Sequence, residues 1–371
     1  MLDRLAVEAI DWQCYCLSLR APFRTAHGLL TARRGAIIEV KGAGGSLQGY
    51  GELAPLPPFS PPLERTLAAL PTLASRLQGM SLAAALALLE REQERADSHL
   101  PAPVTFALEV ALLDLQARAA RQGLLAPYAR SAVPVNAAIG VAAPPEAAQA
   151  ARQAVASGFR CLKLKLAGAG KEGEDLERLA AVRASIGQNI TLRLDANASW
   201  SLAQAEQMLR ACAPYGVEYV EQPLAADDLE GLRQLRRRSP VPIAADESLN
   251  SLESARQLLR LEAADVLILK PQFLGGLRPA LQLIEEATAR GVACVITSAL
   301  EAGIGVCSAL HLAASHPALT RAAGLATLSM LSTDLLTEPL ALNGGLLQLP
   351  SGPGLGVRPD HEALARHSIL L

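Results

Sequence analysis

The chain has 371 residues, of which half are apolar and 19% are charged, and its formal net charge at pH 7 is −2. This is the composition of a globular protein, and the balanced charge, without a basic arm, argues against a nucleic-acid partner. At this length we expect one large core with a smaller companion domain.

The cysteines and the apolar segments indicate the compartment. The six cysteines show neither a C-x-x-C pair nor zinc-ligand spacing, so we expect reduced, buried thiols. The longest apolar helical run, residues 82–89, is far shorter than the roughly 20 residues that span a bilayer, and charged residues near the start leave no signal-peptide core. We therefore expect a soluble, cytoplasmic protein with no membrane partner. The sequence is compatible with a homo-oligomer.

The first 125 residues have the pattern of an α+β domain. Strands are predicted over residues 5–19, 36–41 and 48–53, with a glycine turn between the last two. Between the first two strands lies a polar loop, residues 23–28, which is too long for a tight hairpin and could act as a lid. Helices are predicted from the end of the following proline-rich segment to about residue 122.

From about residue 133 the pattern changes to alternating strands and helices. Apolar strands that end in a polar residue are predicted over residues 135–139, 161–165, 191–195, 219–221, 243–246, 266–270 and 292–297. Their ends follow one another at intervals of roughly 25–30 residues, which fits one strand, one helix and two loops of a TIM-type barrel. A doubly wound sheet is the alternative, but no Gly-x-Gly-x-x-Gly turn follows the first strand. The segment from about residue 325 onward should fold back onto the N-terminal domain.

Two lysines lie two residues apart in the strand predicted over residues 161–165. Side chains alternate along a strand, so Lys163 and Lys165 point to the same face. Lysine is rare in this chain: only five of the 34 basic residues are lysines, and the rest are arginines. Unlike arginine, a lysine that is buried or close to another cation can lose its proton and act as a base. Lys163 and Lys165 are therefore candidate catalytic residues.

Three carboxylates, Asp195, Glu221 and Asp246, stand at the ends of three consecutive predicted strands. The carboxyl ends of barrel strands converge on one face, so these side chains should meet. Three buried carboxylates repel one another unless a cation neutralises them. Oxygen ligands without cysteine or histidine favour Mg²⁺ over zinc, with Mn²⁺ as a substitute. The three residues are therefore predicted to bind a metal ion.

Lys270 ends the next predicted strand, so a lysine flanks this metal site on each side. A carboxylate substrate bound to the ion could lose its α-proton to one lysine, while the ion and the opposite cation stabilise the resulting enediolate. The expected partner is thus a small-molecule carboxylate.

Together these residues resemble the site motif of the muconate-lactonising subgroup of the enolase superfamily, and the similarity spans nearly the whole chain. More narrowly, four segments resemble the o-succinylbenzoate synthase family: residues 51–57 (Gly-Glu-Leu-Ala-Pro-Leu-Pro), 106–109 (Phe-Ala-Leu-Glu), 269–271 (Leu-Lys-Pro) with the glycines at 275–276, and 297–301 (Thr-Ser-Ala-Leu-Glu). The resemblance implies an α/β fold with a modified (β/α)7β TIM barrel over residues 126–325. It also implies an N-terminal α+β capping domain over residues 1–125, completed by a C-terminal segment, 326–371.

The resemblance further implies an activity, the metal-dependent syn-dehydration of 2-succinyl-6-hydroxy-2,4-cyclohexadiene-1-carboxylate to 2-succinylbenzoate through a Mg²⁺-stabilised enediolate. This is a step of menaquinone and phylloquinone biosynthesis. Lys165 would remove the α-proton and then protonate the departing hydroxyl, Lys163 would lower the pKa of Lys165, and Lys270 would stabilise the enediolate. Arg193 could orient the metal shell or contact the substrate, and Ser298 and Arg24 are candidate substrate contacts.

Other activities of the same subgroup remain open. An N-acylamino acid racemase or a dipeptide epimerase would use lysines on both faces of the substrate as acid and base. Dipeptide epimerases usually carry Asp-x-Asp on the last barrel strand, whereas residues 324–329 contain no acid, which argues against a dipeptide but not against an N-acyl substrate. Muconate cycloisomerisation is less favoured by residues 51–57 and 297–301. A non-catalytic barrel would usually lack a ligand or a base, and all six residues are present.

Overall fold

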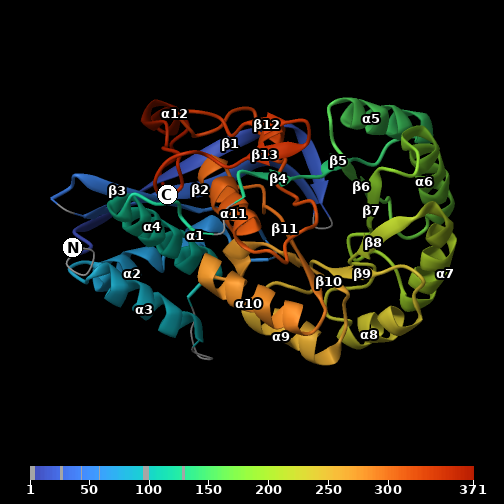
Figure 1. Ribbon diagram of the computed structural model, residues 1–371, viewed down its shortest axis with the longest axis horizontal. Coiled ribbons are helices and arrows are strands. Elements are labelled where there is room, and N and C mark those ends of the chain that lie inside the picture. Colours follow the sequence, from blue (N-terminus) through green and yellow to red (C-terminus); the bar gives the residue numbers. More distant parts are fainter. Residues whose placement is uncertain (1–4, 26–27, 43, 58, 95–99, 128–129) are drawn as a thin grey trace.

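The computed structural model describes residues 5–25, 28–42, 44–57, 59–94, 100–127 and 130–371 (Figure 1). Their strands form three sheets, of which one is antiparallel with three strands, one is parallel with seven strands, and one is a small three-stranded sheet. None of the helices in these ranges is long and apolar enough to cross a membrane.

The antiparallel sheet and the helices that follow it build the N-terminal part of the fold. The sheet consists of β1 (Ala9–Thr25), β2 (Gly28–Gly42) and β3 (Leu47–Leu53), and the helices are α1 (Leu63–Leu67), α2 (Leu70–Leu77), α3 (Leu82–Glu94) and α4 (Ala102–Ala120). As its apolar sequence predicts, α4 is buried on nearly all sides, and it packs against β3. The approach is close because β3 carries glycine: a Cβ at Gly51 would lie 1.9 Å from the carbonyl oxygen of Ala107.

The connection between β1 and β2 differs from the sequence prediction. A polar loop over residues 23–28 was expected, but the strands continue to pair, with Arg24 opposite Leu29 and Thr25 opposite Gly28. Backbone pairing in an exposed ribbon does not require apolar side chains, so the polar composition of this stretch does not mark a loop. Residues 26–27, the rest of the predicted lid, lie outside the described residues.

The seven parallel strands alternate with helices over the rest of the chain. The strands are β5 (Ala137–Ile139), β6 (Cys161–Lys165), β7 (Thr191–Asp195), β8 (Val217–Glu221), β9 (Ile243–Ala245), β10 (Val266–Leu269) and β11 (Ala293–Ile296). The helices are α5 (Pro144–Ala156), α6 (Glu172–Ile186), α7 (Leu202–Cys212), α8 (Leu229–Arg238), α9 (Leu252–Leu261), α10 (Leu277–Ala289) and α11 (Gly303–Ser315), with short 3₁₀ turns η2 (Ala213–Tyr215), η3 (Pro271–Phe273) and η4 (Leu328–Met330). Figure 1 shows α5 to α8 around the outside of the curled sheet.

Two residues close the curled sheet into a barrel. Gly324 bridges in parallel to Thr297, just after β11, and Ala323 bridges in parallel to Val135, just before β5. The short segment 323–324 thus serves as the eighth strand, and the (β/α)7β barrel predicted from the sequence is confirmed. The barrel interior is packed with side chains from adjacent strands: Tyr219, Ala244, Val266, Ile268 and Val295 form one buried cluster.

The C-terminal segment returns to the N-terminal sheet. It contains β12 (Leu342–Asn343), β13 (Leu346–Gln348) and α12 (His361–Arg366), and β13 pairs with β4 (Ala132–Pro134). Isolated bridges join Leu331 to Leu19 and Ser368 to Tyr15. The end of the chain therefore lies against β1.

Candidate active site

The carboxyl ends of β6, β7 and β8 bring together lysines and carboxylates that the sequence singled out. Lys163 Nζ lies 2.8 Å from Glu221 Oε1 and 3.3 Å from Asp195 Oδ2. Lys165 Nζ lies 3.5 Å from the same Asp195 oxygen and donates a hydrogen bond to Asn197 Oδ1 at 3.1 Å. The register explains the meeting, because Lys165, Asp195 and Glu221 are direct neighbours across three adjacent parallel strands.

The next two strand ends supply a second ion pair. Lys270, directly after β10, pairs with Asp246, directly after β9. The ring of Phe59, from the segment between β3 and α1, lies over this lysine with its centroid 4.5 Å from Nζ. Phe59 also stacks on Phe273, with 5.2 Å between the ring centroids. All six predicted catalytic and metal-binding residues thus stand at the same end of the barrel, and a residue of the N-terminal part of the fold covers one of them.

The three carboxylates are buried: the exposed fractions of Asp195, Glu221 and Asp246 are 2%, 1% and 8%. Burial raises the pKa of Glu221 to about 7, although the ammonium group of Lys163 opposes this. Burial acts on Asp195 in the same direction, but Lys163 and Lys165 outweigh it and lower the pKa of that carboxyl. For Lys163, burial is outweighed by the carboxylates of Glu221 and Asp195, which raise its pKa well above the ordinary value. The cluster therefore depends on positive charge.

Three further polar residues of the cluster were not singled out from the sequence. Glu247 is buried, and burial together with the Asp246 carboxylate raises its pKa to about 8. Asn197 donates to Glu247 Oε1 at 3.2 Å, and its φ of +46° is strained for a residue other than glycine. Gln222, with φ +36°, accepts hydrogen bonds from the backbone N–H groups of Asp246 and Ser248, so it fixes the loop after β9. Each follows one of the three carboxylates by one or two residues in the sequence, which could have indicated them.

The carboxylate oxygens of this cluster fit a divalent cation, although in this structure they face lysines. Within the described ranges, no three acidic, histidine or cysteine side chains are close enough together to hold an ion as they stand. Each carboxylate of Asp195, Glu221 and Asp246 is instead paired with an ammonium group. The donors are carboxylate oxygens, which suit Mg²⁺. Moreover, Glu247 Oε2 is buried with no hydrogen-bond partner among the described residues.

The three predicted substrate contacts lie in different places. Ser298, two residues after β11, stands at the same end of the barrel, where its Oγ lies 2.8 Å from Thr327 Oγ1. The side chain of Arg24 lies outside the described residues. Arg193 is only 1% exposed, and its guanidinium contacts Glu218, Asn136 and the carbonyl of Ala322. The structure therefore does not bring Arg193 into the cluster of lysines and carboxylates.

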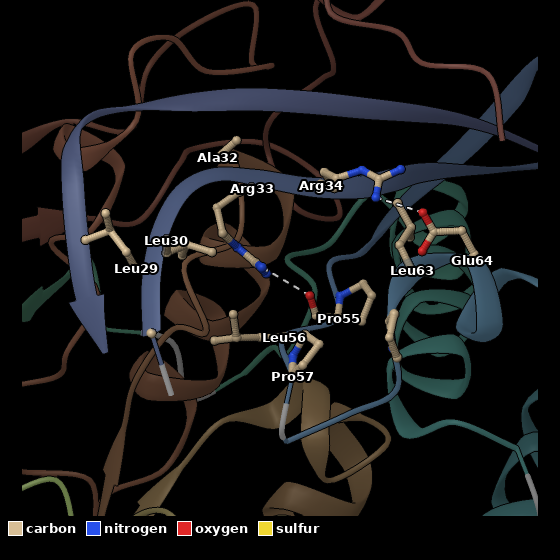
Figure 2. A pocket seen from close by; sticks show the side chains of 12 residues that line it. Leu29, Leu30, Ala32, Arg33, Arg34, Pro55, Leu56, Pro57, Leu63 and Glu64 are labelled. Atoms are coloured by element: carbon tan, nitrogen blue, oxygen red, sulfur yellow. Dashed lines mark hydrogen bonds and ion pairs between the residues drawn. The ribbon is translucent and has the colours of Figure 1, made fainter. Parts of the chain in front are cut away.

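A cavity of about 310 Å³ lies between the start of β2 and the proline-rich segment that leads to Phe59 (Figure 2). Its walls are largely apolar and include Leu30, Leu56 and Leu63. Figure 2 shows the buried Arg33 directed at the carbonyl oxygen of Pro55, which accepts its hydrogen bond at 3.1 Å. The cavity thus borders the end of the β1–β2 ribbon where the sequence suggested a lid.

Comparison with known proteins places the chain among enzymes of one family. Residues 146–363 match the family described as "Enolase C-terminal domain-like". The chain is 42% identical over 230 residues to o-succinylbenzoate synthase of Thermobifida fusca, which covers 62% of this chain and 70% of the relative. It is 32% identical over 362 residues to L-Ala-D/L-Glu epimerase of Bacillus subtilis, covering 95% and 97% of the two chains. N-succinylamino acid racemase of Thermus thermophilus is also 32% identical over 362 residues, with 95% of each chain covered.

Solved structures agree with the sequence relatives. Muconate lactonizing enzyme from Pseudomonas fluorescens, complexed with muconolactone, superposes with a TM-score of 0.89 at 27% identity, over 98% of this chain and 99% of the other. Dipeptide epimerase from Enterococcus faecalis, complexed with Mg and the dipeptide L-Leu-L-Tyr, gives 0.87 at 30% identity, over 95% and 99%. The chain therefore belongs to the enolase C-terminal domain-like family, in the muconate-lactonising subgroup of the enolase superfamily.

Proposed function

We propose that this protein is a Mg²⁺-dependent o-succinylbenzoate synthase of menaquinone or phylloquinone biosynthesis. It would dehydrate 2-succinyl-6-hydroxy-2,4-cyclohexadiene-1-carboxylate to 2-succinylbenzoate. The observation that carries the proposal is the meeting of Lys163, Lys165 and Lys270 with three buried carboxylates at one end of the barrel. The 42% identity to the Thermobifida fusca synthase supports the choice of substrate.

In this proposal Asp195, Glu221 and Asp246 hold Mg²⁺, which would supply positive charge at the substrate carboxylate. Lys165, as the neutral amine, takes the α-proton, and the electron pair of the broken C–H bond moves toward the carboxylate. Lys270, as the ammonium, faces the developing negative charge, and Phe59 shields it from water. Lys165 then gives its proton to the departing hydroxyl on the same face, so that water leaves and the ring becomes aromatic.

The segment after the barrel seam supports a substrate without an ammonium group. Residues 324–329 follow the closing bridge and carry no acid that could pair with a free amine. Ser298 and Thr327, whose hydroxyl oxygens lie 2.8 Å apart, would provide neutral hydrogen-bonding groups there. Both features fit an acyl or succinyl substrate better than a dipeptide.

The direct test is a spectrophotometric assay of the purified protein with the cyclohexadiene substrate, with Mg²⁺ and with EDTA. We expect formation of 2-succinylbenzoate that stops when EDTA removes the metal and resumes when Mg²⁺ is restored. Absence of turnover in the presence of Mg²⁺ would overturn the dehydratase assignment.

A second candidate is racemisation of N-succinylamino acids. It is favoured by the similarity to the Thermus thermophilus racemase along 95% of the chain and by lysines on both flanks of the carboxylates, which could act on the two faces of an α-carbon. Incubation with an N-succinylamino acid in D₂O tests it. Deuterium at the α-carbon, detected by mass spectrometry, would establish this activity, and retention of the α-proton would exclude it.

A further inference from the structure

The strand that carries Glu221 contains an irregularity directly below the candidate active site. In the pairing of β7 with β8, Leu192 lies opposite Val217 and Leu194 lies opposite Val220. Two residues of β8, Glu218 and Tyr219, therefore face the single residue between the two leucines. This is the arrangement of a β-bulge.

The bulge decides where Glu221 points. Side chains alternate along a strand, and a shift of one residue moves every following side chain to the other face. If β8 kept the register of Leu192 and Val217 without a bulge, Val220 would lie opposite Asp195, and Glu221 would point away from the barrel interior. With the bulge, Glu221 is the direct neighbour of Asp195. The carboxylate cluster thus depends on an irregularity that side chains below it must stabilise.

Arg193 is the residue opposite the bulge, and it contacts both bulged residues. Its Nε donates to Glu218 Oε2 at 2.6 Å, and its guanidinium carbon lies 4.9 Å from the centroid of the Tyr219 ring. The side chain is 1% exposed, so these contacts are made in the barrel interior, where a charge without partners would be costly. Arg193 therefore holds the two residues of the bulge against one strand.

The same guanidinium also reaches the seam of the barrel. Arg193 Nη1 donates to the carbonyl oxygen of Ala322 at 2.7 Å and to Asn136 Oδ1 at 3.3 Å. Ala322 and Asn136 are the sequence neighbours of Ala323 and Val135, which form one of the bridges that close the barrel. On the other side, Glu218 pairs with Arg321 at the edge of a cavity of about 470 Å³, which opens at the amino ends of the strands. One buried side chain thus links β7, the bulge in β8 and the closing segment.

We infer that Arg193 is a positioning residue: its contacts with Glu218, Tyr219 and Ala322 hold the β8 bulge and thereby direct Glu221 to its place beside Asp195. The inference rests on the proposed function only in so far as Glu221 is taken to bind Mg²⁺. The effect on the strand itself is independent of the metal and can be measured in its absence.

The test compares Arg193→Met with Arg178→Met, a matched control. Arg178 is also a buried arginine, with 3% exposure, an ion pair to Asp175 and a hydrogen bond to the carbonyl of Ala142 at 2.7 Å, but it lies in α6 outside the barrel. Amide hydrogen exchange without metal is measured over residues 217–221 and, for reference, over residues 266–269 of β10. Calorimetry then gives the Mg²⁺ dissociation constant, with Glu218→Gln as a second variant that keeps the shape of the side chain.

We expect Arg193→Met and Glu218→Gln to lose exchange protection in residues 217–221 but not in 266–269, and to bind Mg²⁺ about 10-fold more weakly. Arg178→Met should leave the Mg²⁺ dissociation constant unchanged. Its exchange protection in residues 217–221 should change no more than its global stability does. Unchanged exchange in residues 217–221 in a folded Glu218→Gln protein, or the same change in Arg178→Met, would overturn the inference. If the wild-type protein binds no Mg²⁺ while local protection is still lost, the positioning role holds and the proposed function fails.

Discussion

Three of the five lysines of this chain contact the same group of buried carboxylates. Lys163 and Lys165 reach Asp195 from β6, and Lys270 pairs with Asp246. The other two, Lys41 and Lys171, form ion pairs near the surface at 2.8 and 2.6 Å. The scarcity of lysine in an arginine-rich chain was therefore informative, because the lysines that it singled out lie in one cluster of buried carboxylates.

Replacing Lys165 by alanine should remove the base of the proposed reaction. We expect turnover of the cyclohexadiene substrate to fall by about 10²–10⁴-fold, the usual contribution of a positioned acid or base, while the carboxylates still bind Mg²⁺. Steady-state kinetics and calorimetry on the same preparation separate the two effects. Lys171→Ala, which alters an exposed lysine paired with Glu174, is the control and should keep full activity. Comparable activity of Lys165→Ala and Lys171→Ala would refute the role of Lys165.

Phe59 offers a second test at the level of single residues. Its ring lies over the Lys270 ammonium, and such a contact is worth about 0.5–2 kcal/mol. Phe59→Leu keeps an apolar side chain but removes the ring, so kcat/KM should fall about 2- to 30-fold. Trp12→Leu, at a half-exposed aromatic residue of β1, should leave kcat/KM unchanged. An unchanged kcat/KM in Phe59→Leu would show that the ring does not assist Lys270.

The lysines and the three acids at strand ends were easier to recognise from the sequence than Glu247 and the neutral residues around them. Lysines and acids at strand ends are recognisable because strand ends converge in a barrel. Phe59 could not be found in this way, since it comes from the segment before α1 and meets Lys270 only through the packing of distant parts of the chain. Arg193 was expected to orient the metal shell or contact the substrate, but its pairing with Glu218 depends on a bulge that no sequence period indicates.

At the scale of elements, glycine in β3 allows the contact between the N-terminal sheet and α4. We expect Gly51→Ala to destabilise the protein by about 3 kcal/mol, because its Cβ would lie 1.9 Å from the carbonyl oxygen of Ala107 and the helix must move. Urea unfolding measures the change. Gly140→Ala, where an added Cβ meets no atom within 4 Å, is the control. Equal stability of the two variants would contradict this packing argument.

The regular strands and helices could be predicted from the hydrophobic periodicity of the sequence, whereas the irregular segments could not. Alternating strands and helices predicted the barrel, since each apolar strand must be buried between its neighbours and a covering helix. The pairing of Arg24 with Leu29, by contrast, occurs in a polar stretch, and the eighth strand is only the segment 323–324. Neither has a hydrophobic pattern from which it could be predicted.

At the scale of the whole molecule, buried carboxylates from the N-terminal part of the fold attach it to the barrel. Glu52 of β3 accepts hydrogen bonds from the backbone N–H groups of Ala302 and Gly305 at the start of α11, both at 2.7 Å. Glu109 of α4 accepts from Leu277 N–H at the start of α10, at 2.5 Å. Each carboxylate satisfies N–H groups that the helix itself leaves without partners.

This attachment predicts a pH dependence of stability. Burial raises the pKa of Glu109 to about 7, despite the N–H donor of Leu277 and the nearby Arg278. A folded-state pKa above the unfolded value of about 4.3 means that this group stabilises the fold at low pH and that the contribution is lost as the pH rises toward 7. Glu109→Gln stays neutral and keeps an oxygen for Leu277. Its free energy of unfolding relative to wild type should therefore increase from pH 4.5 to pH 7 by roughly 2–3 kcal/mol. A difference that does not change with pH would contradict the assignment.

Asp195, Glu221 and Asp246 are proposed to bind one metal ion together. Calorimetric titration of the purified protein with Mg²⁺ tests this most directly, with Glu221→Gln as the variant and Glu253→Gln, at an exposed carboxylate of α9, as the control. We expect saturable binding of one Mg²⁺ that is retained in Glu253→Gln and lost in Glu221→Gln. Absence of binding in the wild-type protein, or equal affinity in both variants, would contradict it.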